Sequence, residues 1–216
     1  FLKKEKTNLE KVTQKIRYYD INSSNDQEFL NNICSGHKEL LNSLELEISD
    51  DGEYYIIKKY YDKEIKNLEI PSVYKDIPIK VIDSNAFENC SKLENIVLPD
   101  CIEIIRDSAF YNCKLLKKIN IPNNIKIIGN KVFENCENLE YAIENGNGYL
   151  GNEQNKFVVL AYVKKNIKKF VYNKETKIVL NDVFKLSTEL SDVIYPGTLE
   201  DYCNLIFSNE YSKSLT

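Results

Sequence analysis

The apolar positions of the chain recur at a fixed interval between residues 87 and 140. The phenylalanines lie 23 residues apart, and so do the cysteines that follow them: Phe87, Phe110 and Phe133, then Cys90, Cys113 and Cys136. Written as one unit, the repeat is F-x-N-C-x-x-L-x-x-I-x-[LI]-P-x-x-I-x-I-I-x-x-x-[AV]. A fixed period of about 20–50 residues is typical of solenoids. The pattern therefore predicts stacked coils in which each phenylalanine and each cysteine contacts its own copies.

Each repeat predicts one short strand that ends at a proline. Ile96 and Leu98 alternate with Val97, which places the first two on the core side of a strand and Val97 on its outer side. Pro99 follows directly and ends the strand, because proline cannot donate to a strand ladder. Successive coils would pair these strands in parallel, about 4.8 Å apart. The isoleucines within 102–105 are expected on the return side of the coil.

Weaker copies extend the pattern in both directions. Upstream, "IKNLEIPSVYKDIPIKVIDSNAF" is a longer version of the unit, and downstream, "IKKFVYNKETKIVLNDVF" reaches Phe184 after an insertion. We therefore predict an α/β solenoid of about five 23-residue coils over residues 65–197, with short parallel strands. The insertion, "ENGNGYLGNEQNKFVVLAYV", predicts a β-hairpin that projects from the coil at about 143–166.

In the segments outside the solenoid, the apolar residues recur at other spacings. Apolar residues at helical spacing begin the chain, at Leu9, Val12, Ile16 and Tyr19. With a second stripe after Ser24, they predict a helical N-terminal cap or hairpin over residues 1–45. The alternative is a two-helix coiled contact with a partner or another domain. Residues 46–64 predict a β-hairpin with its turn at Asp51-Gly52. Residues 198–216 predict a C-terminal capping helix and tail, because Thr198 and Asp201 have the spacing of a capping box.

The stretch "IPSVYKDIPIKVIDSNAFENCSKLENIVLP" resembles the BspA-type (Treponema pallidum-type) leucine-rich repeats, in which the proline, the Ala-Phe pair and the cysteine recur together. The ending "YPGTLEDYCNLIFSNEYSKSL" is similar to a closing element of such proteins, with Tyr202 where tryptophan is usual. The resemblance implies a curved, right-handed leucine-rich-repeat superhelix. It also implies a role in binding, most often on bacterial surfaces, with adhesion to host proteins for some members. It brings no catalytic motif.

Charge and composition narrow the classes of partner. The formal net charge is −4, with Lys and Glu interspersed, so the chain offers no basic field for a nucleic-acid backbone. No apolar run approaches the roughly 20 residues that cross a bilayer, so we expect no membrane insertion. The chain begins at Phe1 and contains no Met, which indicates a trimmed fragment that could lack a signal peptide or a further domain.

The reactive side chains do not form a recognisable catalytic or metal site. His37 is the single histidine, and Cys34-x-x-His37 is half of a zinc spacing without a second pair. We therefore expect no enzyme activity, no cofactor and no metal. Three of the six cysteines occupy one repeat position, so free buried thiols explain them better than a disulfide framework. Stacked coils could still bring two sulfurs within bridging distance, which keeps disulfides as the alternative.

The outward positions of the predicted strands are the candidate protein-binding site. In leucine-rich solenoids this sheet lines the concave face, and by register its outward residues are Lys66, Asn67, Glu69, Asn95, Val97, Lys117, Lys118, Asn120, Lys168, Lys169, Val171, Asp192 and Ile194. Exposed valines and an isoleucine on an open sheet favour a contact surface over a solvated spacer, which is the alternative.

These features favour a non-enzymatic binding module for a protein ligand, such as a host or matrix protein, secreted or on a cell surface. An intracellular structural scaffold, self-associating through its N-terminal helices, is the alternative function and would be cytoplasmic. A third reading is an enzyme whose catalytic domain lies outside the sequence. The sequence leaves the oligomeric state open.

Overall fold

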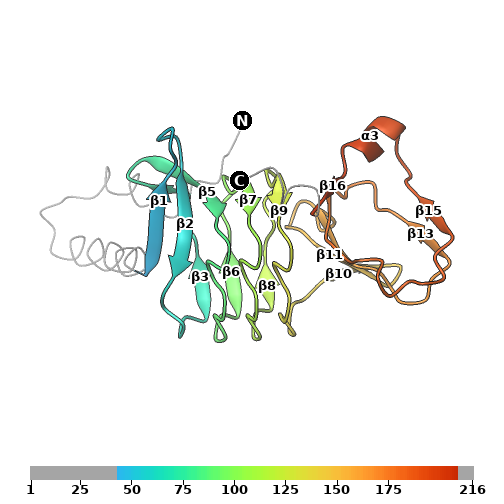
Figure 1. Ribbon diagram of the computed structural model, residues 1–216, viewed down its shortest axis with the longest axis horizontal. Helices are drawn as coiled ribbons and strands as arrows, with labels where there is room; N and C mark the ends of the chain where they lie inside the picture. The colour runs from blue at the N-terminus through green and yellow to red at the C-terminus, as the bar shows by residue number, and fades with distance from the viewer. Residues whose placement is uncertain (1–42, 209–216) are drawn as a thin grey trace, which may run out of the picture.

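The computed structural model describes residues 43–208, and these residues coil along one long axis (Figure 1). The helical cap expected for residues 1–45 lies almost entirely outside the described residues, as does the tail after residue 208.

In the segment where a hairpin is expected, β1 (Leu44–Ile48) pairs antiparallel with β2 (Tyr55–Tyr60). Gly52 in the connecting turn has a φ of +75°, which a residue with a Cβ rarely adopts. The expected domain boundaries remain predictions.

Each clear turn of the coil supplies two strands, one on each side. The first parallel sheet has the order β3 (Asn67–Glu69), β6 (Asn95–Val97) and β8 (Lys118–Ile119). On the return side, β2 is followed in parallel by β5 (Ile77–Ile82), β7 (Ile104–Ile105) and β9 (Ile127–Ile128), and β4 (Val73–Tyr74) pairs with β5. The sequence predicted only one strand in each turn. The return-side isoleucines also form a ladder because their spacing places equivalent residues in register, as with Ile104 and Ile127.

The repeated phenylalanines form a single column, as the sequence predicts. The ring of Phe110 lies parallel to the rings of Phe87 and Phe133, with centroid separations of 5.1 and 5.9 Å. Tyr60 continues the column beyond Phe87 at 5.4 Å. Stacking on copies supplies the apolar wall that one small coil cannot provide for itself.

The asparagine of the F-x-N-C unit has a backbone role. Asn89, Asn112 and Asn135 have φ angles of 60°, 60° and 62°, in the left-handed region. Asparagine tolerates this region better than most residues with a Cβ. The Asn112 side-chain amide also donates to the Asn89 side-chain oxygen at 2.6 Å. Each such turn reverses the chain sharply enough to return the following cysteine to the core.

The insertion contains a hairpin, as expected, but this hairpin does not project alone from the coil. Its strands belong to a sheet of order β10 (Ala142–Glu144), β11 (Asn147–Leu150), β12 (Val159–Tyr162), β14 (Ile178–Val179) and β16 (Ile206–Phe207). All of β11 is buried, and β12 pairs in parallel with β14. The segment is long enough to form a turn of its own, so the solenoid has about six turns rather than about five.

The last turns contain β13 (Lys169–Val171), β15 (Asp192–Ile194) and helix α3 (Leu199–Cys203). The capping box at Thr198 and Asp201 is present. None of the helical residues is buried. Tyr202 of α3 and Tyr195 nevertheless place their rings 6.4 and 5.9 Å from the ring of the buried Tyr172. The role of α3 as a cap of the last coil stays a prediction.

Candidate interaction surface

The sheet β3-β6-β8 presents its alternate residues outward, as expected. Its central side chains Leu68, Ile96 and Ile119 are buried in the core. In the parallel register Asn67 lies opposite Asn95, and Glu69 lies opposite Val97. Of the candidate residues on these turns, two are half-buried, Asn95 and Asn120, and six are exposed, Lys66, Asn67, Glu69, Val97, Lys117 and Lys118.

Two amide contacts tie part of this surface to the fold itself. The Asn95 side-chain amide donates to the side-chain oxygen of Asn67 at 2.6 Å, which links neighbouring turns. Asn120 accepts from the backbone amide of Leu98 at 2.7 Å and donates to its carbonyl at 2.8 Å. The polar atoms of Asn120 are therefore engaged with the backbone of the preceding turn, and Asn120 acts mainly in holding the turns together.

Val97 is the apolar centre of this surface, and its side chain is 51% exposed. An ion pair lies on the neighbouring turn, where Lys117 Nζ is 2.8 Å from a Glu94 carboxylate oxygen. The hydrogen bond from Lys117 lowers the pKa of Glu94 and raises the pKa of Lys117 itself. An exposed pair of this kind is screened by solvent and contributes little to stability. The charges and Val97 together make a mixed apolar and polar patch of the kind that partner proteins contact.

The sheet β13-β15 forms a second patch. Val171 lies directly opposite Ile194, and each is 40% exposed. Lys169 lies opposite Asp192, and Lys168 is exposed beside them. The two aliphatic side chains thus form one cross-strand apolar pair with opposite charges at one end.

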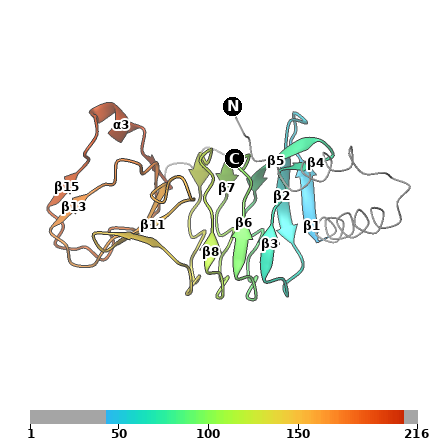
Figure 2. The ribbon, with the colours of Figure 1, turned by 180° about the vertical axis from the view of Figure 1, so that it is seen from behind.

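The structure does not join the candidate residues into one continuous sheet. The two parallel sheets are separate, because β10 pairs antiparallel with β11 instead of continuing from β8. The ribbon shows β3, β6 and β8 in the middle of the molecule and β13 and β15 at its far end (Figures 1 and 2). We call the first set the central patch (Lys66, Asn67, Glu69, Asn95, Val97, Lys117, Lys118 and Asn120) and the second set the terminal patch (Lys168, Lys169, Val171, Asp192 and Ile194).

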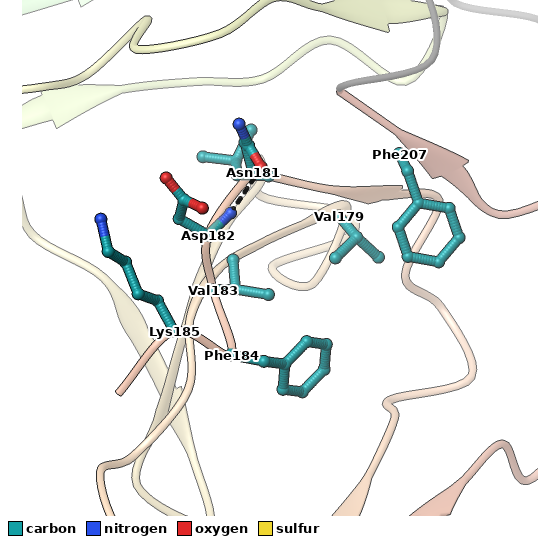
Figure 3. A pocket seen from close by; sticks show the side chains of 8 residues that line it. Val179, Asn181, Asp182, Val183, Phe184, Lys185 and Phe207 are labelled. Carbon is teal, nitrogen blue, oxygen red and sulfur yellow. Dashed lines mark hydrogen bonds between the residues drawn. The ribbon is translucent and has the colours of Figure 1, made fainter. Parts of the chain in front are cut away.

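A hollow of about 380 Å³ lies beside β14 and β16, and no sequence motif predicted it. Figure 3 shows apolar side chains, including Phe184 and Phe207, on one part of its wall and the polar side chains of Asp182 and Lys185 on another. The asparagine at 181 accepts a hydrogen bond from the Asp182 backbone amide, so it helps to fix this turn. The hollow is wide open, and its polar groups do not converge on a single point.

The cysteine column is reduced throughout the described residues. Cys90, Cys101, Cys113, Cys136 and Cys203 are free, as expected, and Cys34 lies outside the described residues. The thiol of Cys113 donates to the carbonyl of Phe87 at 3.1 Å, and the thiol of Cys136 donates to that of Phe110 at the same distance. These thiols are structural core groups that satisfy backbone carbonyls of the preceding turn.

One lysine near this column was not identified from the sequence. Lys63 Nζ donates to the Glu88 carbonyl at 2.9 Å and to Cys90 Sγ at 3.3 Å. The neighbouring Cys113 thiol and then Lys63 lower the pKa of Cys90, although its burial acts in the opposite direction. Cys90 is fully buried, so this thiol is shielded from solvent.

Within residues 43–208 no group of three or more His, Cys, Asp or Glu side chains is placed to hold a metal ion. In the same part of the chain, none of the helices has the length and apolar character needed to cross a bilayer. His37 lies outside the described residues. What the geometry offers is contact surface, in the form of two patches and an open hollow.

Comparison with known proteins agrees with this architecture. The model of the BspA type leucine rich repeat region matches residues 56–154 in six copies. A leucine rich repeat protein of T. pallidum superposes with a TM-score of 0.50 and 18% identity, over 71% of this chain and 79% of that chain. No curated protein sequence matches.

Two longer solved structures are also similar. A leucine rich cell surface protein from Faecalibacterium prausnitzii has a TM-score of 0.49 and 18% identity, over 77% of this chain and 41% of its own. A leucine-rich repeat protein from Bacteroides ovatus has a TM-score of 0.48 and 20% identity, over 71% of this chain and 40% of its own. Residues 56–154 therefore match the BspA-type leucine-rich repeat region, and the stacked parallel turns have the fold of a leucine-rich-repeat protein.

Proposed function

We propose that the chain is a non-enzymatic binding module that contacts a protein ligand through the central patch. The observation that carries the proposal is Val97, which is 51% exposed at the middle of an open parallel sheet. Its register partner Glu69 is charged, and the outward row two residues earlier in the strands, Asn67, Asn95 and Lys118, is polar or charged. The patch therefore has an apolar centre and a polar rim. Protein interfaces commonly have this arrangement.

The terminal patch is the second contact point of the module. Val171 and Ile194 form an exposed aliphatic pair there, with charged residues beside them. Two small patches on separate sheets favour a ligand that is large enough to touch both, or a weak contact that is strengthened by repetition. A host or matrix protein bound in adhesion, with the module on a cell surface or secreted, fits this requirement and the family resemblance.

The test is capture of partners by the 216-residue protein and by two matched variants. Val97→Lys places a charge at the centre of the central patch, and Ile48→Lys makes the same change at a residue of β1 that is 42% exposed. Partners that bind the central patch are captured by the wild type and by Ile48→Lys but lost with Val97→Lys. Capture that survives Val97→Lys unchanged contradicts the proposal.

An intracellular scaffold is the second candidate function. The free thiols favour it, because Cys90, Cys113 and Cys136 are reduced within one column of the core and reducing compartments keep thiols in this state. Surface labelling of intact cells with a reagent that does not cross membranes separates the two locations. Labelled protein supports the surface-displayed module, and labelling only after lysis supports the scaffold.

A further inference from the structure

At the C-terminal end of the described residues, one core position of β15 is uncovered. The central residues of the earlier strands have exposed fractions of a few per cent: Leu68 4%, Ile96 1%, Ile119 8% and Phe170 1%. Val193 takes the corresponding place in β15, directly opposite Phe170, yet it is 49% exposed. The cause is that β15 is the last strand of its sheet, so nothing in the described chain covers Val193 as the next turn would.

The backbone groups of the central residue of β15 also point away from β13. Asp192 donates its amide to the Lys168 carbonyl at 3.0 Å, and Ile194 accepts from the Tyr172 amide at 2.9 Å, so both residues direct their backbone groups toward β13. In a parallel ladder the residue between them directs its N–H and C=O to the other side. The backbone of Val193 therefore faces outward at the far edge of the last turn, where Figures 1 and 2 both show β15. Such an edge is a template for an added strand.

The charge of this end indicates what could bind there. Between residues 186 and 208 the chain has no Lys, Arg or His and has four acidic residues, Glu189, Asp192, Glu200 and Asp201. On its paired side, β15 places Asp192 opposite Lys169. A strand on the free side also lies beside Asp192, so it is favoured by basic side chains. A second copy of this end would instead bring like charges together.

We propose that β15 binds an extended segment of another protein that carries lysine or arginine next to β-branched or aromatic residues. The segment adds as a parallel strand and hydrogen-bonds to the Val193 backbone. Its central apolar side chain covers Val193, and its basic side chains lie beside Asp192. The chain's own β13 shows the chemistry required, because Lys168 and Lys169 precede Phe170 and Val171 there. This site is the sheet edge; it shares Asp192 with the terminal patch and uses no residue of the central patch.

The experiment titrates the 216-residue protein into a fluorescently labelled synthetic peptide, KKNIKKFVYN, the sequence of residues 164–173. Saturable binding is expected, and it should weaken at higher salt because the contact is partly electrostatic. Val193→Lys should weaken binding at least tenfold, since it places a charge in the apolar column and repels the peptide lysines. Ile48→Lys is the matched control, at a residue of β1 that is 42% exposed and belongs to neither patch, and should bind the peptide like the wild type.

A second peptide, in which all four lysines are glutamate, tests the charge requirement and should bind at least tenfold more weakly. The proposal is overturned if the first peptide does not bind, if Val193→Lys binds it like the wild type, or if the glutamate peptide binds equally well. It is also overturned if the protein alone forms a dimer that Val193→Lys abolishes, because a second copy then covers the edge. Circular dichroism of Val193→Lys should match the wild type, since the side chain is half exposed. Each of these results leaves the capture test of the central patch unaffected.

Discussion

Replacing Phe110 by alanine tests the stacked core at its middle. Phe110 is fully buried, and its ring lies between those of Phe87 and Phe133 at 5.1 and 5.9 Å, with 10° between the planes in both cases. Truncation of a buried phenylalanine to alanine costs about 3–5 kcal/mol. Each ring pair contributes about 0.5–1.5 kcal/mol beyond the buried area, and Phe110 takes part in two pairs. We therefore expect Phe110→Ala to lower the free energy of unfolding by about 4–5 kcal/mol.

Urea denaturation followed by far-ultraviolet circular dichroism measures this loss, and tyrosine fluorescence gives a second probe because the chain has 15 Tyr and no Trp. For a domain of this size, 1 kcal/mol corresponds to about 2–4 °C in Tm, so the midpoint of thermal unfolding should fall by about 8–20 °C. Leu115→Ala is the control on the same turn, at a residue that is 39% exposed, and should cost less than about 1 kcal/mol. A loss for Phe110→Ala as small as that of Leu115→Ala would refute the stacked column.

Three further predictions concern the turns, the charges and the thiols. Asn112 has a φ of 60°, so Asn112→Val should lower the free energy of unfolding by more than about 1 kcal/mol, whereas Asn112→Gly should cost clearly less; equal losses in urea denaturation would contradict the left-handed turn. Burial raises the pKa of Asp83, but hydrogen bonds from Lys58 and Arg106 outweigh it and hold the pKa below the ordinary 3.8. Asp83→Asn should therefore lower the free energy of unfolding by about 1–3 kcal/mol at pH 7. This difference in stability from the wild type should shrink as the pH falls below about 4, because the carboxylate of the folded protein becomes protonated. A difference in stability that persists at pH 2 would exclude this linkage. With a maleimide reagent the exposed Cys203 should react in the native protein and Cys113 only on unfolding, and mass mapping that finds equal rates would contradict the buried thiol column.

The core was predictable because each repeated residue packs against the equivalent residues of the neighbouring turns. Phe87, Phe110 and Phe133 recur in register, so the sequence itself states what each ring contacts. The alternation that buries Ile96 and exposes Val97 was equally readable, since strand periodicity depends only on local geometry.

The insertion could not be predicted in the same way, because it lacks the repeat signature. Asn145-Gly146 is a strong hairpin signal, and both residues do have positive φ angles in a turn between antiparallel strands. Whether such a hairpin projects or packs is decided by the strands around it. The burial of Tyr149 and the parallel pairing of Val159 with Ile178 show that it packs.

The sequence predicted which residues of the candidate site point outward, but not which of their side chains are already hydrogen-bonded within the fold. Alternation correctly directs Val97, Val171 and Ile194 outward. It could not show that Asn120 hydrogen-bonds to the backbone of Leu98, because that contact depends on how the two turns approach each other. The exposure of Val193 depends on the absence of a covering strand in the described chain, which alternation along a single strand does not reveal.

The central claim is that equivalent residues of consecutive turns lie on one another. Nuclear Overhauser spectroscopy on protein with labelled phenylalanine rings tests it most directly. The account predicts cross-peaks between Phe87 and Phe110 and between Phe110 and Phe133, at centroid separations of 5.1 and 5.9 Å, and none between Phe87 and Phe133. Rings that show no contact with each other, in protein that is folded by circular dichroism, would contradict the solenoid and the binding surfaces that depend on it.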